Sequence, residues 1–203
     1  MRKVICFLDK ELRRALGVFE FCDAPDCLLR IRITSAAHTL SLPGRVVSEG
    51  ALVLELHLWN EHIPTLPTDG PDLAWAVQTR RKLVTSFHAL AGQMPRDPRF
   101  AAVQAVGGIT VMLLPGSDAG GEKLFRRLGF SVYPHHSPLG RFGEFWENLY
   151  SWWIMWAFNP PTLRHHHLLR LHRSEVWMLA DEFLQRYGAN DERKHQNVYK
   201  CCF

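Results

Sequence analysis

A carboxylate and an imidazole stand two positions apart in LELHLWNEH, the segment 54–62 of the chain. Apolar and polar residues alternate along it, which is typical of a half-buried β-strand, and alternate side chains of a strand share a face. Glu55, His57 and Trp59 therefore share one face, while the leucines lie on the other. A carboxylate next to a histidine favours the protonated imidazole and fixes its tautomer. We predict that Glu55 and His57 form an acid–base pair.

The residues around this pair extend the candidate site. Trp59 offers a flat ring against which a sugar can pack, and Asn60 and His62 follow where the predicted strand ends. We predict that these three residues contact a polar ligand. The plain alternative is a half-exposed sheet face that carries an incidental polar pair.

A second group of histidines lies in LRHHHLLRLHR, the segment 163–173. In an extended conformation His166, Arg170 and His172 share a face, where they predict an anion site for a phosphate or an acidic lipid. The alternative is a basic strand or loop in solvent. The histidines do not follow an H-x-x-x-H zinc pattern and the chain has no C-x-x-C pair, so we expect neither a metal site nor a cofactor.

An aromatic helix is predicted over residues 140–158, before the Pro-Pro pair at 160–161. Steps of three and four place seven large apolar residues on one stripe of this helix. They are Phe142, Phe145, Trp146, Leu149, Trp152, Trp153 and Trp156. Core packing is the first interpretation of this stripe. The second is contact with a membrane or a partner protein through Trp146, Trp152, Trp153 and Trp156.

The bulk properties fit one globular domain. The chain has 203 residues, of which 47% are hydrophobic, and a formal net charge of +4. This charge is mild and no basic run accompanies it, so we expect no nucleic-acid partner. A polar or anionic small molecule, a protein assembly or a membrane surface remain as expected partners. The N-terminal apolar stretch is broken by Asp9, Lys10 and Glu11, and no window offers the roughly 20 apolar residues of a membrane span. We expect the protein in the cytoplasm, in solution or at the inner face of the membrane.

The order of the predicted elements indicates an α+β fold, with an antiparallel N-terminal β-meander packed against several helices in a single domain. Residues 1–188 form this domain, and residues 189–203 form a polar, flexible tail. Strands are expected at 27–34, 38–42, 45–48, 51–60, 107–116 and 130–134, with a turn at Pro43-Gly44. Helices are expected at 3–16, 72–91, 97–106, 119–129, 140–158 and, capped by Ser174, at 175–188.

The order of several segments resembles the YkoP-like domain family. They are GRVV and LELHLWNEHI, WAVQTRRKLVTSFHALAGQM, DPRFAAVQAVGGITVMLL, LFRRLGFSVYP and SEVWMLADEFLQRYG. The resemblance covers about residues 28–188, and its most recognisable piece is the L-H-L-x-N core at 56–60. Domains of this family occur alone or attached to bacterial polysaccharide deacetylases. The resemblance therefore implies a role in bacterial envelope or glycan metabolism. It does not imply deacetylase activity, because the metal-binding motif of that enzyme is not among these residues.

Three hypotheses for function remain open. The first is an accessory domain that binds a polar ligand through Glu55, His57 and Asn60, beside enzymes at the cytoplasmic membrane surface. The second is a small transferase or hydrolase in which His57 acts as general base and Glu55 orients it. The third is a subunit of a larger assembly, docked through the aromatic helix 141–158.

Overall fold

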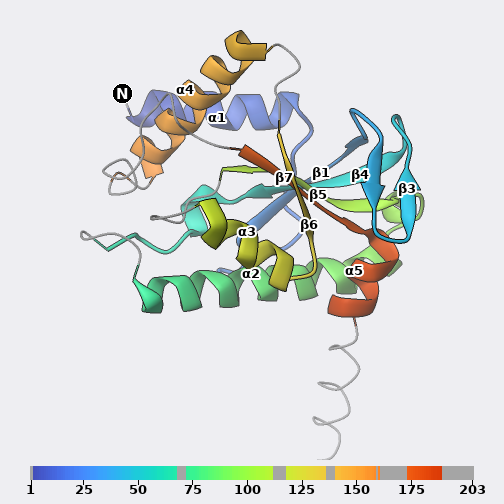
Figure 1. The fold of residues 1–203 in the computed structure, drawn as a ribbon. Coiled ribbons are helices and arrows are strands. Elements are labelled where there is room, and N and C mark those ends of the chain that lie inside the picture. The colour runs from blue at the N-terminus through green and yellow to red at the C-terminus, as the bar shows by residue number, and fades with distance from the viewer. Residues whose placement is uncertain are drawn as a thin grey trace, which may run out of the picture.

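A mixed five-stranded sheet forms the middle layer of the computed structural model, with helices on both of its faces (Figure 1). The structure describes residues 2–67, 72–111, 118–135, 140–158, 160 and 173–188. The helices are α1 (Arg2–Ala15), α2 (Leu73–Gln93), α3 (Asp118–Arg127), α4 (Gly140–Phe158) and α5 (Ala180–Tyr187). The strands are β1 (Leu29–Ser35), β2 (Leu40–Leu42), β3 (Arg45–Val47), β4 (Leu52–Leu58), β5 (Ala105–Val111), β6 (Ser131–Pro134) and β7 (Arg173–Leu179).

The strand order of the sheet is β1-β4-β5-β7-β6. The pair β4–β5 is parallel, and the other neighbouring pairs are antiparallel. Strands β2 and β3 form a separate two-stranded hairpin. Its two-residue turn contains Gly44 with φ of 81°, a conformation that glycine adopts without the steric cost of a Cβ atom.

The main core lies between one face of the sheet and helices α2, α3 and α5, which Figure 1 shows below it. The strands contribute alternate residues such as Ile31, Leu54 and Val106, and Phe87 of α2 lies at the centre with no exposed surface. The ring of Phe87 contacts the rings of three aromatic neighbours, Phe130, Phe183 and Tyr187. Burial of this apolar surface is the main contribution to the stability of the fold.

The opposite face of the sheet is covered in two parts. The β2–β3 hairpin packs a smaller apolar cluster over one end, where Val47 meets Val53, Trp177 and Leu179. Helices α1 and α4 lie against each other over the same face (Figure 1). Polar side chains occupy the sheet surface between these two covers, as described below.

The predicted α+β class is confirmed, and the helices expected at 3–16, 72–91, 119–129 and 140–158 correspond to α1 to α4. The predicted meander differs in its pairing, because β1 pairs directly with β4 and not with β2. The tail at 189–203 lies outside the described residues.

Two predicted helices are wrong. The segment 97–106 forms a short 3-10 turn, Pro98–Phe100, and then enters β5. The segment after Ser174 is strand β7 as far as Leu179, and only Ala180–Tyr187 is helical. Strand β7 is buried on both faces, so its sequence lacks the polar and apolar alternation that marks a half-exposed strand.

We predict that Phe87→Ala lowers the free energy of unfolding by about 3–5 kcal/mol, because it opens a cavity among packed aromatic rings. Urea unfolding followed by circular dichroism measures the change. Val77→Ala on the exposed side of the same helix is the control, with an expected change within about 0.5 kcal/mol. Equal effects of the two substitutions would contradict the position of this core.

Candidate functional site

Glu55 and His57 lie together on the polar face of β4, as the sequence predicted. Oε2 of Glu55 is 3.5 Å from Nε2 of His57 and 3.5 Å from a guanidinium nitrogen of Arg32, its register partner on β1. The side chain of His57 is 36% exposed. Its Nε2 atom has no hydrogen-bond partner among the described residues. The two side chains are therefore in contact, and the imidazole is partly exposed although its Nε2 atom is buried.

The residues that follow β4 are packed more tightly. The ring of Trp59 stacks on His62 with 3.9 Å between ring centroids, and the guanidinium of Arg30 lies 4.4 Å from the Trp59 ring centroid. His62 donates from Nδ1 to the carbonyl of Cys27 at 2.7 Å. Because Trp59 is buried between two neighbours, its faces are not open to a sugar ring. Asn60 is half-buried at the start of the 3-10 turn Asn60–His62.

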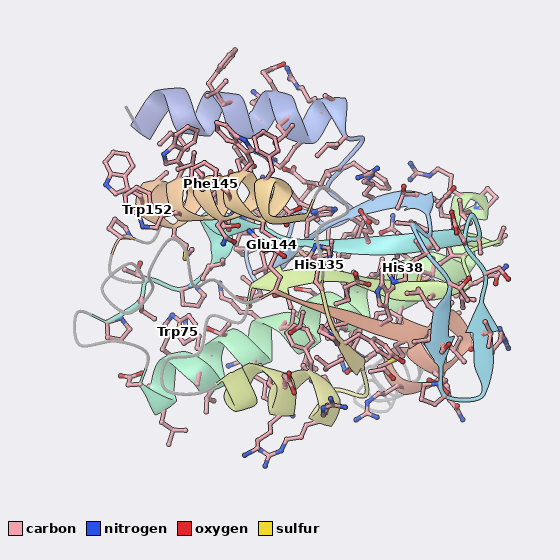
Figure 2. The ribbon with its side chains drawn as sticks, turned by 45° about the horizontal axis from the view of Figure 1, so that its top comes forward. His38, Trp75, His135, Glu144, Phe145 and Trp152 are labelled. Carbon is pink, nitrogen blue, oxygen red and sulfur yellow. The ribbon has the colours of Figure 1, made fainter. Side chains whose placement is uncertain are left out.

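A second carboxylate–histidine group, which the sequence did not predict, lies around Glu175 of β7. Nδ1 of His135 donates to Oε1 of Glu175 at 2.9 Å, and the indole N–H of Trp177 donates to Oε2 at 3.1 Å. Nε2 of His38, from the β1–β2 connection, is 3.3 Å from the same Oε2 atom. Figure 2 shows His38 and His135 over the sheet, with Glu144 of α4 on the same side. Glu175 is thus a buried carboxylate enclosed by nitrogen atoms.

His135 also faces helix α4. Its Nε2 atom is 3.7 Å from Oε2 of Glu147 and has no hydrogen-bond partner among the described residues. The His135 side chain is 8% exposed. A buried imidazole nitrogen without a hydrogen bond is costly, and such atoms in native proteins call for an explanation.

Arg173, at the start of β7, links helix α4 to the sheet by hydrogen bonds. The guanidinium donates to the side-chain oxygens of Asn148 and Ser151 and lies 3.7 Å from Glu147. Burial lowers the pKa of Arg173, while the nearby charges of Glu147 and Glu144 act in the opposite direction. The donors of this guanidinium are therefore committed to α4.

The two carboxylate–histidine groups lie on one face of the sheet, on either side of β5. Gly107 of β5 pairs with Glu55 of β4, and Ile109 pairs with Glu175 of β7. Strands β4 and β7 are two strand spacings apart, about 10 Å. Ile109 is 50% exposed although β5 is the central strand of the sheet. We call this surface the sheet strip; it consists of Glu55, His57, Ile109, His135 and Glu175, with His38 at its edge.

Gly107 makes room for the ring of Trp177 beside Glu55. A Cβ atom at this position would lie 2.0 Å from the carbonyl oxygen of Val176 and 2.5 Å from the Trp177 ring. The indole of Trp177 therefore lies directly against the bare backbone of β5, which orients its N–H toward Glu175. A larger residue at 107 would displace this ring.

A hydrogen-bonded network holds α1 and α4 together at the edge of the same face. The hydroxyl of Tyr150 donates to Oδ1 of the buried Asp9 at 2.7 Å, and Arg13 donates to Oδ2 at 2.8 Å. Burial raises the pKa of Tyr150 well above its ordinary value, and the hydrogen bond and negative charge of Asp9 raise it further.

The aromatic stripe of α4 lies mainly on the solvent side of the helix. Phe142 is 68% exposed and Trp146 is 51% exposed, whereas Ile154, Met155 and Asn148 are buried. Phe145 and Trp153 are exposed, and Trp152 and Trp156 are half-buried. The side facing α1 and the sheet is thus formed by smaller or polar residues, and the interpretation of the whole stripe as core is wrong.

The segment with His166, Arg170 and His172 lies outside the described residues, so its relation to the sheet strip stays a prediction. No group of three His, Cys, Asp or Glu side chains within the described part of the chain has a geometry that could hold a metal ion. The described helices include none that is long and apolar enough to cross a membrane.

The sequence would have indicated Glu175 if residues 173–179 had been interpreted as a strand, since Glu175 and Trp177 then share a face.

Tyr150→Phe is predicted to lower the free energy of unfolding by about 1–3 kcal/mol at neutral pH, because a buried carboxylate oxygen loses its donor. The native state raises the pKa of Tyr150, so its stabilising contribution is present below the ordinary value of about 10 and is lost as the pH rises above it. Urea unfolding at increasing alkaline pH should show a smaller loss of stability in Tyr150→Phe than in the wild type.

Tyr133→Phe, which removes a hydroxyl that donates to the backbone carbonyl of Ser41 and not to a carboxylate, is the control and should leave the alkaline profile as in the wild type. Identical alkaline slopes for the wild type and Tyr150→Phe would contradict the role given to the Asp9–Tyr150 contact.

Comparison with known proteins identifies a family that the chain matches. The sequence model of the YkoP domain family matches residues 22–187, which include all strands of the sheet. No curated protein and no solved structure matches the chain.

Proposed function

Because this chain belongs to the YkoP domain family, we propose that it is an accessory domain that binds a polar small molecule on the sheet strip. The observation that carries the proposal is the half-exposed Ile109 on a central strand, flanked by two carboxylate–histidine groups. A central strand is normally covered on both faces, and an uncovered apolar patch with polar side chains around it is typical of a binding surface. A role in bacterial envelope or glycan metabolism is part of the same proposal.

A small transferase or hydrolase is the second candidate. Its support is the contact between His57 and Glu55, which lie 3.5 Å apart at a partly exposed position. An imidazole oriented by a carboxylate can accept a proton from a hydroxyl group of a substrate. In this mechanism His57 is the general base, Glu55 orients it, and Arg32 holds Glu55 from the neighbouring strand.

We predict that the purified wild-type chain retains a small molecule and that His57→Ala abolishes this retention without unfolding the protein, because the side chain is partly exposed and its Nε2 atom has no hydrogen-bond partner among the described residues. Native mass spectrometry of the full chain measures the retained mass, and circular dichroism checks the fold. Gln78→Ala on α2, which covers the other face of the sheet, is the control and should retain the ligand. Full retention by His57→Ala would exclude this residue from the site.

Docking to a partner protein through α4 is a third candidate, supported by the exposure of Phe142 and Trp146. Aromatic side chains are enriched among the residues that dominate binding at protein interfaces. A peripheral position at the inner membrane face belongs to the same group of proposals, because indole rings also favour the membrane interface.

Phe142→Ala and Trp146→Ala are each predicted to change the free energy of unfolding by less than about 0.5 kcal/mol, since both side chains face solvent. Met155→Ala on the buried side of α4 should cost about 2–5 kcal/mol. Urea unfolding measures all three variants. If Phe142→Ala lowered the free energy of unfolding by several kcal/mol, the aromatic stripe would belong to the core, and the proposal of docking through α4 would lose its support.

A further inference from the structure

We propose that Cys22 and Cys27 are a modification site, at which a small disulfide such as glutathione disulfide converts the two thiols into a reversible intramolecular disulfide. The site lies in the segment before β1, outside the sheet strip. It does not depend on the ligand proposed for the strip.

The two thiols are already in contact. Of the five cysteines in the chain, Cys22 and Cys27 are the two whose side chains the structure describes, and both are free thiols. The backbone N–H of Cys27 donates to the carbonyl of Ala24 at 2.8 Å, so the chain turns between the two cysteines. The side chain of Cys22 lies within hydrogen-bonding distance of the Cys27 thiol. Thiols in contact are the starting geometry for a sulfur–sulfur bond, which is about 2.0 Å long.

The surrounding structure holds Cys27 in place. Its carbonyl accepts a hydrogen bond from Nδ1 of His62 at 2.7 Å, and the next N–H, of Leu28, donates to Oγ of Ser86 at 2.7 Å. Nζ of Lys82 donates to a backbone carbonyl of the turn at 3.2 Å. The contact between the thiols is therefore supported by helix α2 and by the 3-10 turn after β4.

The two cysteines differ in accessibility, which gives them different roles. Cys27 is 1% exposed, whereas Cys22 is half-buried. Burial raises the pKa of the Cys27 thiol, and the neighbouring Cys22 acts in the same direction. Because the thiolate is the nucleophile in disulfide exchange, Cys22 reacts first with the incoming disulfide and Cys27 reacts second.

The reaction consists of two exchange steps. The Cys22 thiolate attacks one sulfur of glutathione disulfide, forms a mixed disulfide and releases one glutathione thiolate. The Cys27 thiolate then attacks Sγ of Cys22 and releases the second glutathione. The two cysteines lose two electrons and two protons in total, and glutathione disulfide takes them up as two molecules of glutathione.

The product is expected to be easily reduced. The closed ring spans only residues 22–27, and a disulfide that closes a short ring constrains the unfolded chain least. One of its sulfur atoms also lies on a half-buried residue that an attacking thiol can reach. Accessible disulfides of this kind belong to the labile, regulatory type.

Peptide mapping of the full chain tests the proposal. Trypsin cleaves after Arg14 and Arg30, so one peptide, 15–30, carries this pair and no other cysteine. The folded protein is equilibrated in glutathione buffers of increasing oxidised fraction, alkylated in denaturant and digested. The peptide should change from doubly alkylated to unlabelled and two hydrogen atoms lighter, and an excess of reduced glutathione should reverse the change.

Two matched variants separate the roles of the thiols. Cys27→Ala should accumulate glutathione on Cys22, because no second thiol displaces it. Cys22→Ala should leave Cys27 unmodified, since that thiol is buried. Circular dichroism checks the fold of both variants. A stable glutathione adduct as the main product of the wild type, or two alkylated thiols in every buffer, would overturn the proposal.

The wild type unfolded in urea provides a test that needs no variant. At the same ratio of oxidised to reduced glutathione, the equilibrium constant for disulfide formation should be about tenfold or more larger in the folded chain, because the fold holds the thiols together. An equal or smaller constant in the folded chain would show that closeness in sequence alone closes the ring, and it would also overturn the proposal.

Discussion

The buried carboxylate of Glu175 is the constraint on which the arrangement of this face depends. Removal of a charged carboxylate from water costs several kcal/mol unless donors surround it. The donors here come from three places in the chain: His135 after β6, His38 between β1 and β2, and Trp177 on the same strand. Their positions are therefore coupled, since a shift in any of them leaves a buried oxygen without a partner. The end of β6, the entry to the hairpin and the indole over Gly107 are fixed together.

The two faces of the sheet are held by different kinds of contact. The face toward α2, α3 and α5 is an apolar core centred on Phe87. The face toward α1 and α4 is held largely by hydrogen bonds and charge pairs, such as Asp9–Tyr150 and Arg173–Asn148. Contacts of the second kind contribute less net stability but specify geometry closely.

The sequence predicted most helices and the pair Glu55–His57, because amphipathic periodicity depends on one solvated face. It failed at β7, where Ser174, Val176 and Met178 are buried on one face and Trp177 on the other. A strand covered on both sides has no periodic signature, so capping and composition favoured a helix there. Glu175 was missed for the same reason. His38 and His135 could not be predicted, since their contact with Glu175 depends on strand order, which short sequence patterns do not contain.

The origin of His38 has one more consequence. This residue lies in the connection between β1 and β2, outside the hydrogen-bonded strands, whereas Ile109 is locked in a strand that is paired on both sides. Exchange of that connection alone would alter the rim of the strip and leave the sheet register intact. For the binding site that we propose, a rigid apolar centre would thus be combined with a border that can change independently, which would give the scaffold a simple route to new specificities.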